Sequence, residues 1–281
     1  MLYIYSYIGG YKVLFISNSA IDISEFMNEY PKDSIEMQLL NKMSTSSEKY
    51  QYSNLNQLKF ELNLRKEIVN SAIDLNNSDL NFSVFEDSRC NPEYWHRTSN
   101  GGFLLNNGAK PNEAIRDIFS NGSKYATECA TAMMIVYYKG LLNVYGDDLF
   151  NRLFPEIYLM GWDVREPLLK EVAVLEHVTD ILLGDRGYFN NPDFNPRTPQ
   201  WEGENVIVLP NSLYYGHGIG ITTANTIIQE LNSARKENAT HSAYLMHSLG
   251  RPNFNKLFSH YQSTPSRMAP LVWKPFPPPI S

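Results

Sequence analysis

Residues 125–146 read YATECATAMMIVYYKGLLNVYG, and apolar side chains fill nearly every helical position in this stretch. A helix that is apolar all round its surface is buried rather than laid on the outside of a protein. We therefore predict a central helix here, with Thr127 as its N-cap and with Gly140 or Gly146 near its end.

Weaker patterns on either side of this segment predict the other elements. Apolar residues recur at helical spacing from Leu55, which predicts an amphipathic helix, and a short helix is expected over 113–119. Short surface helices are expected over 22–52, and irregular structure or a hairpin over 82–103. Strands are predicted at 157–162, 181–189, 205–209 and 213–222, the last two paired as a hairpin, followed by a last helix over 224–235. A buried helix ahead of an antiparallel sheet indicates an α+β fold.

The two ends of the chain differ in character. The apolar residues 1–17 lack a basic leader and a small-residue cleavage site, so they predict a strand rather than a secretory signal. Six of the 16 prolines follow Ser263, which predicts an extended tail. We expect one domain over 1–263 and a Pro-rich extended tail over 264–281.

Composition excludes several classes of protein. With 24 Lys and Arg against 30 Asp and Glu, the formal net charge is −6, whereas nucleic-acid binding needs a basic surface. The 2 cysteines cannot form a disulfide framework or a four-thiolate metal site. The longest apolar runs fall short of a membrane span. Histidine and aspartate spacings fit neither a zinc nor a calcium motif, so we predict no metal site.

Cys129 lies in the first turn of the predicted central helix. Unpaired backbone N–H groups and the positive end of the helix dipole favour a thiolate there, as in many cysteine nucleophiles. Glu128 is typical of a helix N-terminus, but its charge beside the sulfur opposes thiolate formation. A buried cysteine with no chemical role is the alternative. Cys90 has no base in its local sequence and is predicted to be a bystander.

Two possible partners for the thiol, Glu204 and His217, lie in the predicted hairpin. If its loop has two or four residues, Val206 lies opposite His217, and Glu204 shares the sheet face of His217. A loop of three residues would place the two side chains on opposite faces. A solvated glutamate and a hydrogen-bonded strand histidine are the alternatives.

Several runs along the chain resemble one enzyme family. They are KFELNLR at 59–65, AIRDI at 114–118, YATECATA at 125–132, GD at 184–185 with YF at 188–189, QWEGENVI at 200–207 and HGIG at 217–220. In this order and spacing the chain is similar to the spore-coat transglutaminases of endospore-forming bacteria, from about Ser53 to His260. These are calcium-independent protein-glutamine γ-glutamyltransferases.

The resemblance implies a papain-like or NlpC/P60-like core, in which the helix carrying the nucleophile packs on an antiparallel sheet. It implies Cys129 as the nucleophile, Glu204 as the principal acid and base, and Glu128 as a second carboxylate that substitutes in part. His217 matches the family's histidine near the site. The implied reaction joins protein glutamine to protein lysine by an ε-(γ-glutamyl)lysine bond, through a Cys129 thioester and with release of ammonia. No cofactor is implied.

A carboxylate is a weak base unless it is desolvated, so we expect apolar walls around the thiol. Candidate substrate-binding side chains are Phe82, Trp162, Tyr188 and Trp201, with an ordinary aromatic core as the alternative for each. Glu202 falls at the variable position of the Trp-x-Gly-Glu-Asn motif and is given no role.

Two other functions fit some of the same features. An NlpC/P60-type cysteine amidase or peptidase would use the same thiol but pass the acyl group to water, and the Glu-Asn motif in place of a histidine base favours the transferase. A non-catalytic structural coat protein fits the 18 tyrosines and the tail, against an intact Cys129 and Glu204. The expected partners are spore-coat proteins, with no nucleic acid and no membrane. The expected location is the spore coat, after synthesis in the mother-cell cytoplasm without a signal peptide.

Overall fold

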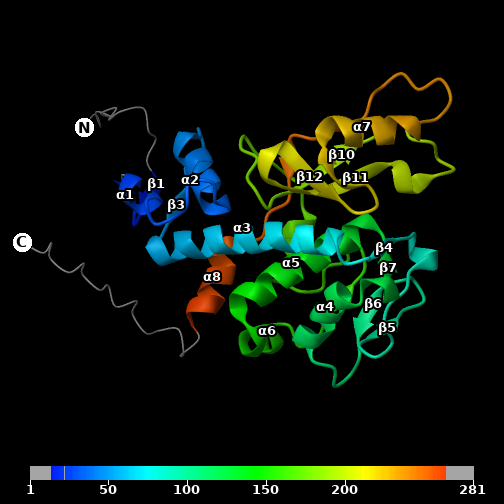
Figure 1. Ribbon diagram of the computed structural model, residues 1–281, viewed down its shortest axis with the longest axis horizontal. Helices are drawn as coiled ribbons and strands as arrows, with labels where there is room; N and C mark the ends of the chain where they lie inside the picture. The colour runs from blue at the N-terminus through cyan, green and yellow to red at the C-terminus, as the bar shows by residue number, and fades with distance from the viewer. Residues whose placement is uncertain (1–13, 22, 264–281) are drawn as a thin grey trace, which may run out of the picture.

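A computed structural model describes residues 14–21 and 23–263 (Figure 1). The helices are α1 (Ser24–Met27), α2 (Ile35–Thr45), α3 (Leu55–Asn76), α4 (Pro111–Ser120), α5 (Cys129–Tyr145), α6 (Asp147–Leu153), α7 (Ala224–Ser233) and α8 (Phe254–Gln262). The strands are β1 (Leu14–Ile16), β2 (Ser19–Ile21), β3 (Gln51–Tyr52), β4 (Asn81–Phe82), β5 (Trp95–Arg97), β6 (Phe103–Leu105), β7 (Ala126–Thr127), β8 (Tyr158–Leu159), β9 (Glu176–His177), β10 (Arg186–Asn190), β11 (Gly203–Val208), β12 (Leu213–Gly216), β13 (Gly220–Thr223), β14 (Tyr244–Leu245) and β15 (Ser248–Leu249).

The apolar segment forms the central helix α5, as predicted. Nearly all of its side chains are buried, and it lies beside the long helix α3 in the middle of the molecule (Figure 1). Its C-cap is Gly146, at φ 72°. The amphipathic helix predicted from Leu55 is α3, and its apolar residues join those of α5 in one core.

The main sheet is antiparallel, with strand order β13-β12-β11-β10-β14. Ile207 and Tyr215 lie opposite each other on one face and belong to the core around α5. Val206 and Phe189 pack on the other face against α7, through Ile227. Figure 1 shows the resulting layers, with α7 above the sheet and α3 and α5 below it.

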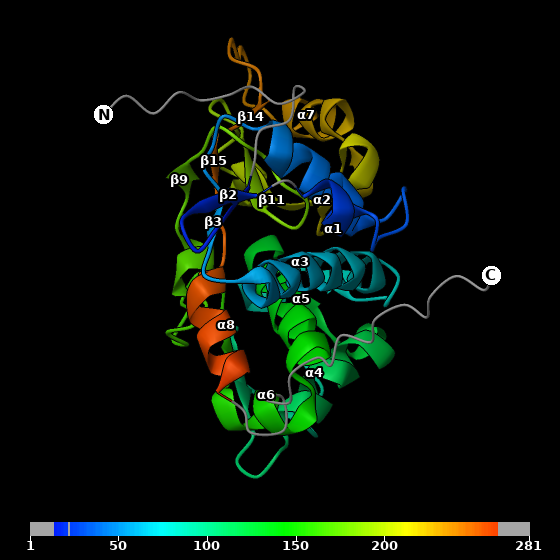
Figure 2. The ribbon, with the colours of Figure 1, turned by 90° about the vertical axis from the view of Figure 1, so that its left-hand side faces the viewer.

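Two smaller groups of strands complete the core. The hairpin of β5 and β6 continues into β8, and the parallel pair β4–β7 places Phe82 opposite Thr127, just before α5 begins. At the other side, α2 and the sheet of β1, β2 and β3 enclose a separate apolar cluster against α3 (Figure 2).

A buried ion cluster joins distant parts of the chain. Asp185 is 0% exposed and accepts hydrogen bonds from Arg65 of α3 and from Arg251, each at 2.8 Å. The segment that leads into β10 is thereby fixed to α3 and to the stretch before α8.

Several predicted boundaries are wrong. Glu128, not Thr127, is the N-cap of α5, because its longer side chain reaches the first free N–H groups. Only Tyr158–Leu159 of the predicted strand at 157–162 pairs, and the run 213–222 divides into β12 and β13 around a turn. Helix α8 follows the helix predicted to be the last.

Residues 1–13, the start of the predicted N-terminal strand, and the tail 264–281 lie outside the described residues. No helix in the described part is long and apolar enough to span a membrane.

Candidate active site

Cys129 is the first residue of α5 and is partly buried. The Glu128 side chain caps the helix by accepting hydrogen bonds from the N–H of Ala130 and from the N–H of Thr131, the latter at 2.7 Å. The Thr131 hydroxyl in turn accepts from the backbone N–H of Gly161 at 2.7 Å. The thiol is therefore held at the positive end of a buried helix, with a carboxylate beside it.

A cavity of about 320 Å³ opens over this helix end. It is lined by side chains from β4 and the segment after it, from β10, and from the segment that leads into β11: Phe82, Val84, Phe85, Glu86, Glu128, Cys129, Tyr188, Pro199, Gln200, Glu202, Gly203 and Asn205. Cys129 is the one thiol in this lining. The thiol therefore borders a cavity that is large enough to hold a side chain.

Glu204 of β11 is 5% exposed, and its carboxylate lies over Gly216 of β12. Its Oε1 has no hydrogen-bond partner among the described residues. Burial, and then the charge of Glu128, raise the pKa of Glu204, while the backbone N–H of His217 acts in the opposite direction. A buried carboxylate with a raised pKa is a stronger base when it is ionised.

Of the two hairpin registers left open by the sequence, the structure has the one in which Glu204 and His217 do not share a sheet face. The connection is the three-residue turn Pro210–Ser212, so Val206 lies opposite Gly216 rather than opposite His217. His217 falls beyond the end of β12, in the turn that leads to β13.

The ring of His217 is occupied by other partners. Nδ1 is 3.1 Å from the Tyr215 hydroxyl and Nε2 is 3.2 Å from the Asn81 carbonyl oxygen. Burial lowers the pKa of His217 to about 4, so the ring is neutral at ordinary pH. These contacts tie β12 to β4, and none of them joins the ring to the sulfur.

The charges around Cys129 act in opposite directions. Burial raises the pKa of the thiol, and the charges of Glu204 and Glu128 raise it further. Asn205 lowers it, because the side-chain Nδ2 donates to Sγ at 3.4 Å. The resting group is a thiol, and a base must take its proton when it attacks.

The family model described as protein-glutamine gamma-glutamyltransferase matches residues 13–261. The chain belongs to this family. A transglutaminase of this name from Halalkalibacterium halodurans is 44% identical over 217 residues, which cover 77% of this chain and 75% of that protein. Another from Bacillus cereus is 41% identical over 249 residues, covering 88% and 89%.

Among solved structures, the transglutaminase from Geobacillus stearothermophilus superposes with a TM-score of 0.69. It is 44% identical, and the match covers 74% of this chain and 98% of that one. The similarity confirms the predicted family and the α+β fold, and a papain-like core agrees with the packing of α5 on the sheet. This transglutaminase is therefore an acyltransferase that crosslinks proteins through glutamine and lysine side chains.

The four aromatic residues predicted to bind substrate lie in different places in the transglutaminase fold. Phe82 and Tyr188 line the cavity. Trp162 and Trp201 are absent from its lining, since the Trp162 ring lies under the guanidinium of Arg186 and Trp201 packs against the cluster beneath α7.

Two neighbours of the thiol had no predicted role. Asn205 was part of the motif that carries the family resemblance, and its position next to Glu204 could have indicated a contact with the site. Arg186 had no such signal. Its Nη1 donates to Asn205 Oδ1 at 3.0 Å, and the amide nitrogen of the same Asn205 side chain donates to the Cys129 sulfur.

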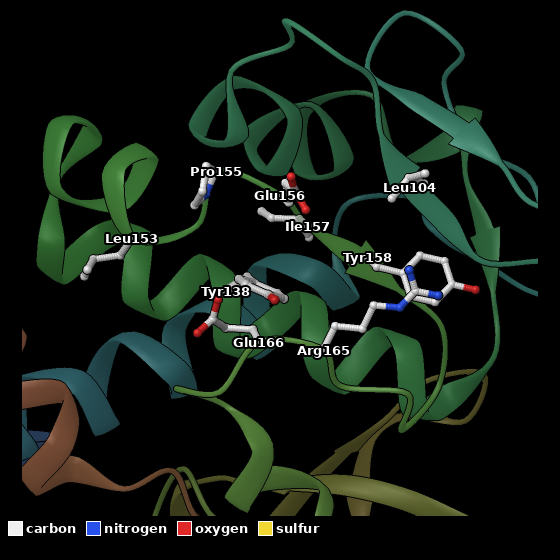
Figure 3. A pocket seen from close by; sticks show the side chains of 9 residues that line it. All are labelled: Leu104, Tyr138, Leu153, Pro155, Glu156, Ile157, Tyr158, Arg165 and Glu166. Atoms are coloured by element: carbon white, nitrogen blue, oxygen red, sulfur yellow. The ribbon is translucent and has the colours of Figure 1, made fainter.

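A second cavity of about 310 Å³ lies beside α5, which contributes Tyr138 to its lining (Figure 3). Arg165 crosses the ring of Tyr158 there, with its guanidinium carbon 3.8 Å from the ring centroid. The remaining lining residues are Leu104, Tyr138, Leu153, Pro155, Glu156, Ile157 and Glu166. It contains no thiol and no histidine, so the cavity over Cys129 is the candidate active site.

In residues 14–21 and 23–263, no group of three or more His, Cys, Asp or Glu side chains gathers where a metal ion could bind.

Cys90, the second cysteine, is also partly buried. Its Sγ lies 3.7 Å from the Trp95 carbonyl oxygen, and burial raises the pKa of its thiol to about 11. Neither cavity is lined by Cys90.

Proposed function

We propose that this transglutaminase transfers the acyl group through a thioester on Cys129, with Glu204 as the principal acid and base. The observation that carries the proposal is the position of Cys129. The thiol begins a buried helix, faces a cavity that a side chain can enter, and lies within the electrostatic reach of two carboxylates.

In the first half of the reaction, Sγ attacks the side-chain carboxamide carbon of a protein glutamine. The thiol proton passes to Glu204 and then to the amide nitrogen, the C–N bond breaks, and ammonia leaves. The glutamine side chain is left as a thioester. The backbone N–H of Cys129 is proposed as a donor to the oxyanion that forms on the way.

In the second half, a neutral lysine amine attacks the thioester carbon. Its proton passes to Glu204 or Glu128, the C–S bond breaks, and the sulfur is protonated again. Both oxygens of Glu128 already accept hydrogen bonds from the start of α5, so we assign it the secondary role.

The walls of the cavity favour the amine over water. Phe82 packs against Gly218 and against the ring of His217, and Tyr188 borders the cavity from β10. Of the four aromatic candidates, these two are therefore proposed to contact substrate. Excluding water from a reactive thioester suppresses hydrolysis.

We further propose that the substrates are spore-coat proteins, that the enzyme is made in the mother-cell cytoplasm and placed on the spore coat, and that it needs no calcium. The resemblance to spore-coat transglutaminases supports the first two statements. For the third, the mechanism draws its nucleophile and its base from Cys129 and Glu204 and has no step that requires an ion.

The test is incorporation of a fluorescent primary amine into casein, with a chelator present. Wild type, Cys129→Ala and Glu204→Gln are compared, with Cys90→Ala as the matched control for the loss of a thiol. We expect activity in wild type and Cys90→Ala, none in Cys129→Ala, and a large loss in Glu204→Gln. Ammonia release without amine incorporation would instead indicate a hydrolase, and loss of activity with the chelator would contradict calcium independence.

A further inference from the structure

Arg186 is a buried cation without a carboxylate partner. Its side chain is 2% exposed, and it makes no ion pair within the described part of the chain. The adjoining Asp185 binds Arg65 and Arg251 instead. Burial lowers the pKa of Arg186 to about 10. An unpaired buried charge is strongly unfavourable, so the position of this guanidinium needs a compensating contact.

Two contacts and one gap in the packing set the position of the guanidinium, whose Nε and Nη2 have no hydrogen-bond partner among the described residues. Nη1 donates to Asn205 Oδ1 at 3.0 Å, and the guanidinium carbon lies 4.2 Å from the centroid of the Trp162 ring. On a third side, a β-carbon at Gly250 would lie 2.7 Å from Nε, so the missing side chain there leaves room for the arginine.

These contacts determine which way the Asn205 amide points. A guanidinium only donates hydrogen bonds, so Asn205 must present its oxygen to Arg186. The amide nitrogen then faces Cys129, 3.4 Å from Sγ. The reverse orientation would place two donors against each other and an acceptor against the sulfur.

We propose that Arg186 is a positioning residue for the transfer reaction, which fixes the Asn205 amide so that it donates to the Cys129 sulfur as negative charge develops there. The inference rests on the proposed role of Cys129 as nucleophile. Two carboxylates oppose that charge, and the amide held by Arg186 acts against them. The titratable and charged groups around the thiol are Glu128 at the start of α5, Glu204 on β11, Arg186 and Tyr188 on β10, and Tyr215 on β12.

The test measures the rate at which iodoacetamide alkylates Cys129 as a function of pH. Peptide mass spectrometry counts Cys129 separately from Cys90. We expect Arg186→Met to slow alkylation of Cys129 about tenfold at pH 8, with the apparent pKa raised by about one unit, because a hydrogen bond to a charged group is lost. Arg186→Lys keeps a cation and a donor, so its effect should be smaller.

The control for loss of a buried cation is Lys139→Met. Lys139 is partly buried on the same helix α5, ten residues and therefore about 15 Å from Cys129. Its replacement should leave the alkylation profile unchanged.

A double variant tests the route through Asn205. Asn205→Leu alone should slow alkylation, and adding Arg186→Met should slow it little further. Independent, multiplicative effects would overturn the proposed route. Arg186→Lys and Asn205→Leu carry the test if Arg186→Met does not fold.

A merely structural role for Arg186 predicts a lower melting temperature with an unchanged alkylation profile, and that result would overturn the inference. The positioning role predicts a changed profile without a loss of melting temperature, because the substitution also removes an unpaired buried charge. Crosslinking by Cys129→Ala would show that the proposed function itself has failed. An inactive Cys129→Ala beside a normal profile in Arg186→Met would show that the inference alone has failed.

Discussion

The carboxylate of Glu204 lies so close to Gly216 that a β-carbon there would come within 2.9 Å of Oε1 and 3.0 Å of Cγ. Gly216 has no positive φ, so its backbone accepts an L side chain without strain. The missing side chain thus leaves the space into which the proposed base folds.

Gly216→Ala is therefore expected to displace Glu204 without unfolding the sheet. A misplacement of a catalytic group by about 1 Å can cost on the order of a hundredfold in rate. We therefore expect the rate of amine incorporation to fall roughly tenfold to a hundredfold. Gly187→Ala is the matched control, because Gly187 lies in the same sheet and faces Val206 and Leu245 rather than Glu204. Equal activities of the two variants would contradict the placement of the base.

The two carboxylates can be separated by their neutral analogues. Glu204→Gln should lower amine incorporation by roughly 10²–10³, a typical contribution of a general base, and Glu128→Gln by less. The double variant should lose the remaining activity. In addition, Glu128→Gln weakens the cap of α5 and should lower the free energy of unfolding by about 1 kcal/mol. A double variant as active as Glu204→Gln would remove Glu128 from the mechanism.

His217 should make the stability depend on pH. Its pKa is about 4 when folded and about 6.5 when unfolded, so between these values the unfolded chain binds more protons. The neutral ring therefore contributes its full share to the free energy of unfolding above about pH 6.5. This share, at most about 3 kcal/mol, is lost as the pH falls toward 4. Denaturant unfolding of His217→Gln should show a flatter dependence over this range. An equally steep curve would argue against a buried neutral ring.

The buried ion cluster should carry much of the stability of the fold. Asp185→Ala leaves Arg65 without one of its two carboxylates and Arg251 without its partner, and should lower the free energy of unfolding by about 3–5 kcal/mol. Asp147→Ala breaks an exposed pair with Arg116 and should cost less than about 1 kcal/mol. Urea unfolding of the two variants measures the difference, and similar losses would show that burial of the cluster contributes little.

Local patterns predicted the parts of the molecule that depend on one segment. The apolar surface of residues 125–146 was sufficient to predict α5 as a central helix, and the spacing from Leu55 predicted α3. The position of Cys129 at a helix start followed directly. The hydroxyl side chain of Thr127 predicts a cap at that position, but the helix begins one residue later, and the Glu128 side chain accepts from the N–H groups of Ala130 and Thr131.

Contacts between distant segments of the chain could not be predicted from such local patterns. The sequence left the loop length of the β11–β12 hairpin open, and Asn211 and Ser212, both at positive φ, close it as a three-residue turn. That register keeps the ring of His217 away from the Glu204 carboxylate, although the backbone N–H of His217 still lowers the pKa of that carboxylate. Arg186 directly follows Asp185 in the sequence, which suggests an ion pair between the two. The fold shows instead that Asp185 forms ion pairs with Arg65 and Arg251.

The most direct test of the proposed mechanism is to trap the acyl-enzyme. The full-length protein is incubated with a glutamine dipeptide blocked at its amino end, in the absence of an amine, then quenched in acid, digested and examined by mass spectrometry. We predict an adduct on the peptide that contains Cys129, with the mass of the dipeptide less one ammonia, which disappears when a primary amine is added. An adduct on Cys90 or on another residue, or crosslinking that survives in Cys129→Ala, would contradict the account.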